Sequence, residues 1–356
     1  MSIDSPPASR LAFPTRRLGM PPLALLEPAP RAGRSRVDLM WHEGRLGLRS
    51  RTPVDGSDWS FAPPTLAFLH HLEPPLPAMI DAYQASLPPH GTAQVRLRTS
   101  PEGRIGAWID MSREAMARLL VERDWLLGRV GAGWLVEMGQ RGEGVLAGRD
   151  GPLLAPATPA TWLPGRDADG GVIPLECHVA SFTQPGPAIN AGLLASLGTL
   201  LDRAGIGVCR WAEWGSGYGN LTAWLATRLG SDGCAVELDG RSRQLLVRNA
   251  VRHFPTVRLE DPEPTRRRSM QAPASSDHDF DILVIDPPRP GFSSRLDGLA
   301  DSPHRPAWVL SLHCDARGLD ADGVALARLG FAPDAWIGVD AFPGTPYLEV
   351  ITLWKR

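Results

Sequence analysis

The sequence has few of the residues that mark several large classes of protein. Only 4 of its 356 residues are cysteine, at Cys177, Cys209, Cys234 and Cys314. They are widely spaced and form no CxxC pair, so the sequence predicts no zinc or iron–sulfur site, and we expect four free thiols. No apolar run approaches the roughly 18 residues that a membrane-spanning helix needs, so we expect no membrane segment.

Two further absences bear on location and partners. The N-terminal residues lack the apolar core of a signal peptide, which predicts a cytoplasmic protein. Lysine is almost missing, with Lys355 the only one, and the formal net charge is −2. A generally basic nucleic-acid binder is therefore excluded, although arginine clusters such as Arg266–Arg268 leave local contacts with phosphate open. High genomic GC content would also produce this bias toward arginine.

The pattern along the chain predicts three regions. Residues 1–33, rich in Pro, Ala and Arg, are expected to form a partly disordered arm. Residues 34–170 combine predicted hairpins with two predicted helices, which indicates a smaller α+β domain, and a stretch rich in Pro, Gly and Asp at 155–171 is the expected linker. In residues 171–356 strands alternate with helices, which predicts an α/β fold with a doubly wound parallel sheet.

The most informative stretch is Phe280–Arg289, in which a short apolar run ends in an acid and two prolines. The run predicts a buried parallel strand, and the prolines end it because they cannot donate a hydrogen bond to a neighbouring strand. Asp286 is therefore expected at the carboxyl end of a strand, where open α/β sheets bind ligands. Cys314 and Glu349 follow downstream, and the three together suggest a nucleophile and a base that face one pocket.

A glycine-rich loop at Trp214–Thr222 lies between a predicted strand and a predicted helix, which is typical of a nucleotide-type cofactor site. Glu213, directly before the loop, suits an ammonium group better than a pyrophosphate. Glu237 ends the next strand, where a carboxylate can accept both ribose hydroxyls. These features favour S-adenosylmethionine over a dinucleotide, which a loop of this kind would also fit; a simple tight turn is the third interpretation.

Four segments now carry a resemblance to bacterial RNA 5-methyluridine methyltransferases. Ser181–Pro185 with Asn190 looks like the family's Phe-x-Gln-x-Asn segment, and Gly217–Thr222 matches its Gly-x-Gly-Asn-Phe-Thr loop. Asp286–Gly291 matches Asp-Pro-Pro-Arg-x-Gly, and Asp340–Glu349 is similar to Asp-x-Phe-Pro-x-Thr-x-His-Val-Glu. The resemblance covers about residues 33–356 and implies a Rossmann-like methyltransferase domain that methylates carbon 5 of a uridine in RNA.

The resemblance also implies roles for single residues. Cys314 would add to carbon 6 of uracil, Glu349 would remove the proton from carbon 5, and Asp286 and Phe182 would bind the base. The expected cofactor site for S-adenosylmethionine comprises Gln184, Glu213, Gly217, Gly219, Asn220, Glu237 and Asp286. RNA is the expected partner, with ribosomal RNA favoured and transfer RNA as the alternative, and the protein is expected to be a monomer without a metal.

The sequence departs from the family in three ways. Cys314 lies in His-Cys-Asp-Ala rather than Ser-Cys-Asn-Pro, no cysteine precedes Cys177 to form the iron–sulfur cluster of many members, and the N-terminal oligonucleotide-binding module is not expected. Two alternatives therefore stay open. Beside uridine methylation, the chain fits a methyltransferase of another chemistry, acting on a nitrogen or a small molecule, or a catalytically silent module that binds RNA or cofactor.

Overall fold

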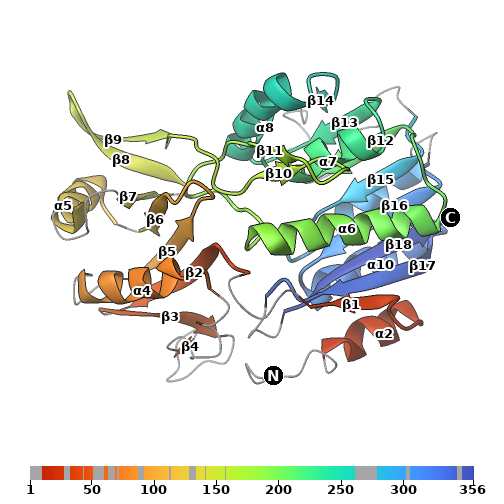
Figure 1. Cartoon of the computed structure of the whole chain (residues 1–356), viewed down its shortest axis with the longest axis horizontal. Coiled ribbons are helices and arrows are strands. Elements are labelled where there is room, and N and C mark those ends of the chain that lie inside the picture. The colour runs from red at the N-terminus through yellow and green to blue at the C-terminus, as the bar shows by residue number, and fades with distance from the viewer. Residues whose placement is uncertain are drawn as a thin grey trace. The chain divides into compact units, whose positions relative to one another are not determined.

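The computed structural model shows two compact units, each described here by itself (Figure 1). It describes residues 10–27, 33–42, 44–50, 60–62, 69, 72–86, 92–111, 114–127, 134–140, 142–156, 158–260, 279–301, 305–342 and 347–356. Unit 1 consists of Met1–Pro28, Pro164–Leu175 and Ala188–Arg356, and unit 2 of Ala29–Leu163 and Glu176–Pro187. The arginine run Arg266–Arg268 lies outside the described residues.

Unit 1 is built on an eight-stranded sheet with the order β1-β17-β18-β16-β15-β12-β13-β14. The strands are β1 (Ala24–Leu26), β12 (Trp211–Trp214), β13 (Gly233–Val236), β14 (Arg258–Glu260), β15 (Ile282–Ile285), β16 (Trp308–His313), β17 (Ala332–Val339) and β18 (Glu349–Lys355). Strands β14, β13, β12, β15 and β16 run parallel, and β18 is antiparallel to both of its neighbours, β16 and β17. The predicted Rossmann-like α/β sheet is confirmed.

Helices alternate with these strands, as the sequence pattern predicts. They are α6 (Pro187–Arg203), α7 (Asn220–Arg228), α8 (Gly240–His253), α9 (Ser293–Leu296) and α10 (Ala316–Arg328). Helix α6 begins with proline. Proline has no backbone N–H, and at the first position of a helix that N–H would have no partner within the helix anyway. Asp239 caps α8 by accepting a hydrogen bond from Ser242 N at 2.9 Å. Strands β12, β13 and β15 are buried at every position, as expected for strands covered on both faces.

Within the arm at residues 1–33, which the sequence predicts to be partly disordered, residues 10–27 are described and include a helix and a strand. Residues Ala12–Leu18 form helix α2, and β1 pairs in parallel with β17 through Leu25 and Gly338. In Figure 1 the red β1 accordingly lies beside the blue C-terminal strands. The partner strand lies more than 300 residues away in the sequence, so local composition could not reveal the pairing. Strand β1 covers an edge of β17 whose backbone groups would otherwise lack a strand partner.

Unit 2 contains a second eight-stranded sheet, with the order β4-β3-β2-β5-β6-β7-β8-β9. Its strands are β2 (Arg36–His42), β3 (Arg45–Ser50), β4 (Ser60–Ala62), β5 (Thr92–Thr99), β6 (Ile105–Asp110), β7 (Trp134–Gln140), β8 (Glu143–Gly148) and β9 (Gly151–Pro156), and its helices are α4 (Pro75–Ser86) and α5 (Met116–Leu127). A single apolar core includes Trp41, Leu97 and Ile109. This is an α+β unit of the predicted kind, with strands β8 and β9 beyond the predicted elements.

The boundary between the units differs from the predicted cut at residue 170. The expected linker contains strand β10 (Gly165–Arg166), which pairs with β11 (Val172–Ile173), and this hairpin belongs to unit 1. Residues Glu176–Pro187 then belong to unit 2, where Cys177 forms a β-bridge with Ala160. The chain therefore passes between the units more often than a single linker allows. No helix in the described part of the chain has the length and apolar character to span a bilayer.

Candidate active site

The glycine loop follows β12 and precedes α7, as predicted. Gly217 and Gly219 have φ angles of +59° and +99°, which glycine adopts without the strain of a side chain. Gly215 lies so close to the neighbouring strand end that a Cβ there would come within 2.6 Å of the Asp286 carbonyl oxygen. The loop backbone thus passes directly over the carboxyl ends of β12 and β15, where the Asp286 N–H also donates to Trp214 O at 3.2 Å.

Glu237 lies directly after β13, at the end of the next strand. Its carboxylate accepts hydrogen bonds from Gly217 N and Asp239 N, each at 2.7 Å. It is half-buried. A carboxylate fixed here beside a glycine loop can accept two hydroxyls of a ribose, as the sequence predicts.

Glu213 is fully buried on β12 and only partly satisfied. One carboxyl oxygen, Oε2, accepts from the Thr222 hydroxyl at 2.6 Å, while Oε1 has no hydrogen-bond partner in the described structure. Burial raises the pKa of Glu213 to about 8; the Thr222 hydrogen bond opposes the shift, and the nearby Asp286 and Glu237 carboxylates add to it. A buried acceptor of this kind lacks a positive group, so the site suits a cationic ligand.

Asn220 begins helix α7 and pairs with an earlier residue of the resemblance. Its amide exchanges two hydrogen bonds with Asn190 on α6, at 3.0 and 2.8 Å. Asn249, a residue that the sequence analysis missed, holds the loop from the other direction because its side chain donates to Tyr218 O at 2.8 Å. Asn220 and Asn249 therefore hold the residues on the two sides of Gly219. The signal for Asn249 was its spacing, because it follows Leu245 and Leu246 by four and three residues and so lies on the buried face of α8.

Three predicted site residues come from neighbouring strand ends. Asp286 follows β15, Cys314 follows β16, and Glu349 begins β18, which runs antiparallel between β16 and β17. The β16–β18 register pairs His313 with Val350, so Cys314 comes next to Glu349 one step beyond the last pair. The order and direction of these three strands thus bring a thiol and two carboxyl groups to the same end of the sheet, where β15 and β16 finish and β18 begins.

Asp286, Cys314 and Glu349 affect one another's pKa values. Burial raises the pKa of the Cys314 thiol to about 12, and the Glu349 and Asp286 carboxylates raise it further, while Arg289 opposes them. Burial, with Asp286 second, raises the pKa of Glu349 to about 8. Burial, with Glu237 second, raises the pKa of Asp286 to about 7. Acids whose pKa values are raised by burial and by one another are typical of functional sites.

The altered surroundings of Cys314 have a structural explanation. Asp315 caps helix α10 by accepting from Arg317 N at 3.0 Å, a task that Asn performs equally well. His313 is buried, and its Nε2 lies 3.0 Å from Asp322 Oδ2. The other oxygen of Asp322 accepts from Phe292 N at 2.7 Å, so Asp322 joins β16 to the loop after Asp286. The sequence analysis missed Asp322 because an acid inside a predicted helix normally faces solvent.

Phe182 and Gln184 belong to unit 2. Gln184 is buried, whereas Phe182 is 60% exposed, with the Arg36 guanidinium 4.5 Å from its ring centroid. Arg98 binds the segment around Phe182. It donates to the His178 and Val179 carbonyls at 3.1 Å and to the Thr183 hydroxyl at 2.6 Å.

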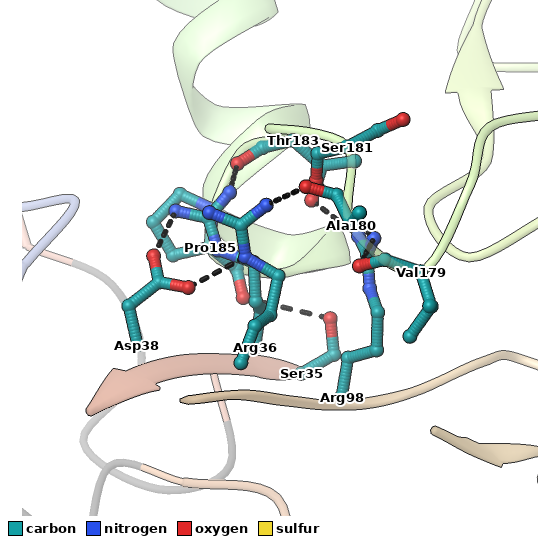
Figure 2. Close-up of polar contacts among 10 residues, drawn as sticks. Ser35, Arg36, Asp38, Arg98, Val179, Ala180, Ser181, Thr183 and Pro185 are labelled. Atoms are coloured by element: carbon teal, nitrogen blue, oxygen red, sulfur yellow. Dashed lines mark hydrogen bonds and ion pairs between the residues drawn. The ribbon is translucent and has the colours of Figure 1, made fainter. Parts of the chain in front are cut away.

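Figure 2 shows these arginines converging on the backbone of residues 179–185. Arg36 also donates to Thr183 O and pairs with Asp38, and burial lowers its pKa to about 9. The segment is held through its carbonyl groups, so the Phe182 ring is left free to contact a ligand.

Comparison with known proteins finds relatives in both sequence and structure. The chain is 30% identical to an uncharacterised RNA methyltransferase of Bdellovibrio bacteriovorus, over 98% of this chain and 86% of the relative. It is 30% identical to the 23S rRNA (uracil(1939)-C(5))-methyltransferase RlmD of Nitrosospira multiformis, over 50% of this chain and 40% of that protein. No family model matches the chain.

Among solved structures, the Pyrococcus abyssi tRNA (uracil-54, C5)-methyltransferase in complex with S-adenosyl-L-homocysteine has the same fold. The TM-score is 0.63 at 15% identity, and the alignment covers 97% of this chain and 81% of the archaeal one. The chain therefore has the fold of an S-adenosylmethionine-dependent methyltransferase. On the strength of the Bdellovibrio relative, which it matches over nearly its whole length, it belongs to the RNA methyltransferase family.

Proposed function

We propose that this protein methylates carbon 5 of a uridine in RNA, with S-adenosylmethionine as methyl donor, Cys314 as nucleophile and Glu349 as base. The observation that carries the proposal is the position of Asp286, Cys314 and Glu349 at the ends of three neighbouring strands, β15, β16 and β18. A thiol, an acid with a pKa near neutrality and an acceptor for a base edge are the groups that this chemistry needs. Ribosomal RNA is the proposed substrate, as it is for the RlmD relative.

The residues around the glycine loop fit the cofactor. When bound, S-adenosylmethionine supplies a methyl group on a positively charged sulfur. Glu213 offers a buried carboxyl oxygen without a partner to an ammonium group, and Glu237 offers its carboxylate to ribose hydroxyls. The pyrophosphate of a dinucleotide would instead bring negative charge beside Glu213, Glu237 and Asp286, which like-charge repulsion disfavours.

Cys314 overcomes the low nucleophilicity of carbon 5. The thiol first loses its proton to solvent, and the thiolate sulfur then bonds to carbon 6 of the uracil. The electron pair of the C5–C6 double bond moves into an enolate, which makes carbon 5 nucleophilic. Burial raises the pKa of this thiol to about 12, and the neighbouring carboxyl groups raise it more than Arg289 lowers it. Positive charge added to the cluster lowers that pKa, so the nucleophile becomes reactive once the cationic ligand is in place.

Asp286 acts before the methyl transfer, when it binds the base, and Glu349 acts after it. The Asp286 carboxylate accepts a hydrogen bond from N3–H of uracil, whereas N3 of cytosine carries no proton to donate. After transfer, Glu349 takes the proton from carbon 5, the C–H electron pair restores the C5–C6 double bond, and the carbon–sulfur bond breaks to release Cys314. The exposed Phe182 of unit 2 is proposed to stack on a base of the RNA.

The test uses RNA that contains 5-fluorouridine. Fluorine on carbon 5 cannot be removed as a proton, so the wild-type protein should form a protein–RNA adduct that survives denaturation. Cys314→Ala should form no adduct and no 5-methyluridine, yet bind S-adenosylhomocysteine normally. Cys209→Ala is the matched control, because Cys209 is a half-buried thiol outside the cluster, and it should behave like the wild type.

Two results would contradict the proposal. Full methylation by Cys314→Ala would exclude this cysteine as the nucleophile. Methyl transfer to RNA by the wild type without any adduct would indicate the other methyltransferase chemistry, on a nitrogen for example. Mass-spectrometric mapping of 5-methyluridine lost on deletion of the gene would identify the RNA and the nucleotide.

A further inference from the structure

The first described residue of the chain makes a buried ion pair close to its other end. Arg10 donates from Nη1 and Nη2 to the two carboxylate oxygens of Asp340, at 2.9 and 2.7 Å. Nη1 also donates to Tyr347 O at 3.0 Å. Both charged side chains are buried, with exposures of 4% for Arg10 and 8% for Asp340. A guanidinium that binds a carboxylate through two parallel hydrogen bonds defines the geometry on both sides.

This contact fixes the connection that leads to Glu349. Strand β17 ends at Val339 and β18 begins at Glu349, and the two residues are paired in the sheet. Asp340 is the first residue of the connection and Tyr347 lies two residues before Glu349, so Arg10 holds it near both ends. The N-terminal segment adds a backbone contact, because the Asp340 N–H donates to Leu26 O at 2.9 Å.

A second arginine holds the same connection from the side of the Asp-Pro-Pro loop. The Arg289 guanidinium lies 4.7 Å from the centroid of the Tyr347 ring, and Phe342 packs edge-on against that ring at 6.4 Å. Arg289 is also the positive group that opposes the raised pKa of Cys314. The approach to Glu349 is therefore fixed from two directions by charged groups, one of them from the opposite end of the sequence.

We propose that Arg10 is a positioning residue for Glu349: by clamping Asp340 and Tyr347, the N-terminal segment sets the place of the base in the uridine methylation proposed above. The inference rests on that proposed function. A buried ion pair is weak evidence for stability, because desolvation of both charges offsets their attraction. It is well suited to geometric control, since an alternative arrangement would leave a buried carboxylate without its partner.

The proposal assigns Arg10 to one step of the reaction only. Formation of the carbon–sulfur bond and methyl transfer depend on Cys314, and they precede the need for a base. Proton removal from carbon 5 depends on Glu349; the electron pair of that C–H bond then forms the double bond as the sulfur leaves as thiolate. A displaced base therefore leaves the methylated adduct in place, with carbon 5 carrying both the methyl group and its proton.

The experiment compares Arg10→Met and Arg10→Lys with a matched control on the same segment. Arg17 on α2 pairs with Asp320 at 2.7 Å but is partly exposed, so Arg17→Met removes an ion pair of the N-terminal segment away from the connection. Each protein is incubated with S-adenosylmethionine and ordinary uridine RNA, and the fraction in a denaturation-resistant adduct and the turnover rate are measured. The rate of adduct formation on 5-fluorouridine RNA and the melting temperature are measured in parallel.

We expect both Arg10 variants to keep wild-type adduct formation on 5-fluorouridine RNA, to accumulate adduct on ordinary RNA, and to turn over roughly 10 to 100-fold more slowly, in line with the effect of a misplaced catalytic group. Arg10→Lys should show the smaller loss because it keeps the charge, and Arg17→Met should match the wild type.

Release of product at the wild-type rate by both Arg10 variants would overturn the assignment. So would loss of 5-fluorouridine adduct formation in proportion to a lowered melting temperature, because that pattern indicates a merely structural role. Failure of the proposed function is distinguishable: the wild-type protein itself would then form no adduct on 5-fluorouridine RNA, and the role of Arg10 would fall with it.

Discussion

Replacement of Glu213 by glutamine should make the ligand-free protein more stable and its cofactor binding weaker. Glu213 is buried beside Asp286 and Glu237, and its Oε1 has no hydrogen-bond partner in the described structure. The amide of Glu213→Gln has nearly the same shape and keeps an oxygen for the Thr222 hydroxyl. It carries no charge, so the cost of burying a carboxylate disappears.

The size and sign of the effect follow from the pKa. The folded state keeps the Glu213 proton up to about pH 8, whereas the unfolded state releases it above its ordinary value of 4.5. Between these values the folded state binds more protons, so the free energy of unfolding falls as pH rises. One pKa unit corresponds to about 1.4 kcal/mol. The difference between the folded and unfolded pKa values of Glu213 therefore lowers the free energy of unfolding by at most about 5 kcal/mol once the pH exceeds 8. Relaxation of the site reduces this, and we expect about 2–4 kcal/mol.

The assay is urea unfolding followed by tryptophan fluorescence at about pH 5 and about pH 8.5, on either side of most of this window. Glu213→Gln should equal the wild type at the lower pH and exceed it at the higher pH. Calorimetry with S-adenosylhomocysteine should show affinity lower by roughly 10 to 100-fold, the value of one charge-assisted hydrogen bond. Glu137→Gln is the control, because burial raises the pKa of Glu137 to about 7 in unit 2.

The control should leave cofactor affinity unchanged. The reasoning would be refuted by a stability difference for Glu213→Gln that does not depend on pH. Unchanged affinity for S-adenosylhomocysteine would instead show that the carboxyl oxygen without a partner has no role in binding the ligand's ammonium group.

Two more substitutions test the loop and the exposed aromatic residue. Gly219→Ala should lower the free energy of unfolding by about 1–3 kcal/mol, because φ is +99° and the new Cβ would lie 2.7 Å from the Phe254 ring; urea unfolding measures this, and a neutral effect would contradict the steric argument. Phe182→Ala should weaken RNA binding by roughly 5 to 100-fold in gel-shift titrations, the value of stacking on one base, while affinity for S-adenosylhomocysteine stays at the wild-type level. Equal loss of both affinities would exclude a specific contact with RNA.

The departure of the sequence around Cys314 takes on a physical meaning in this fold. His313 and Asp322 form a buried pair, and Asp322 also accepts a hydrogen bond from Phe292 N, so one carboxylate joins β16 to the loop after Asp286. Gly291 permits this contact, since a Cβ there would lie 2.5 Å from Asp322 Oδ1. Asp315 caps the following helix. The changed residues therefore keep the strand end ordered, and Cys314 stays half-buried at the ligand edge.

The sequence by itself determined the α/β alternation and the strand-end position of Asp286. Both depend on local signals: apolar runs of strand length, prolines that end them, and glycines that adopt positive φ. It also named the candidate site residues, through motifs whose members lie close together in the chain. Fold class and candidate chemistry are readable because each signal extends over ten residues or fewer.

Only the tertiary structure decided what meets across long separations. The pairing of β1 with β17 and the clamp of Arg10 on Asp340 join residues more than 300 positions apart, in a segment whose composition predicts disorder. The raised pKa values of Glu213 and Glu349 likewise depend on burial and on neighbouring carboxylates that strand order brings together. Strand order and burial are properties of the whole sheet, and no local pattern encodes them.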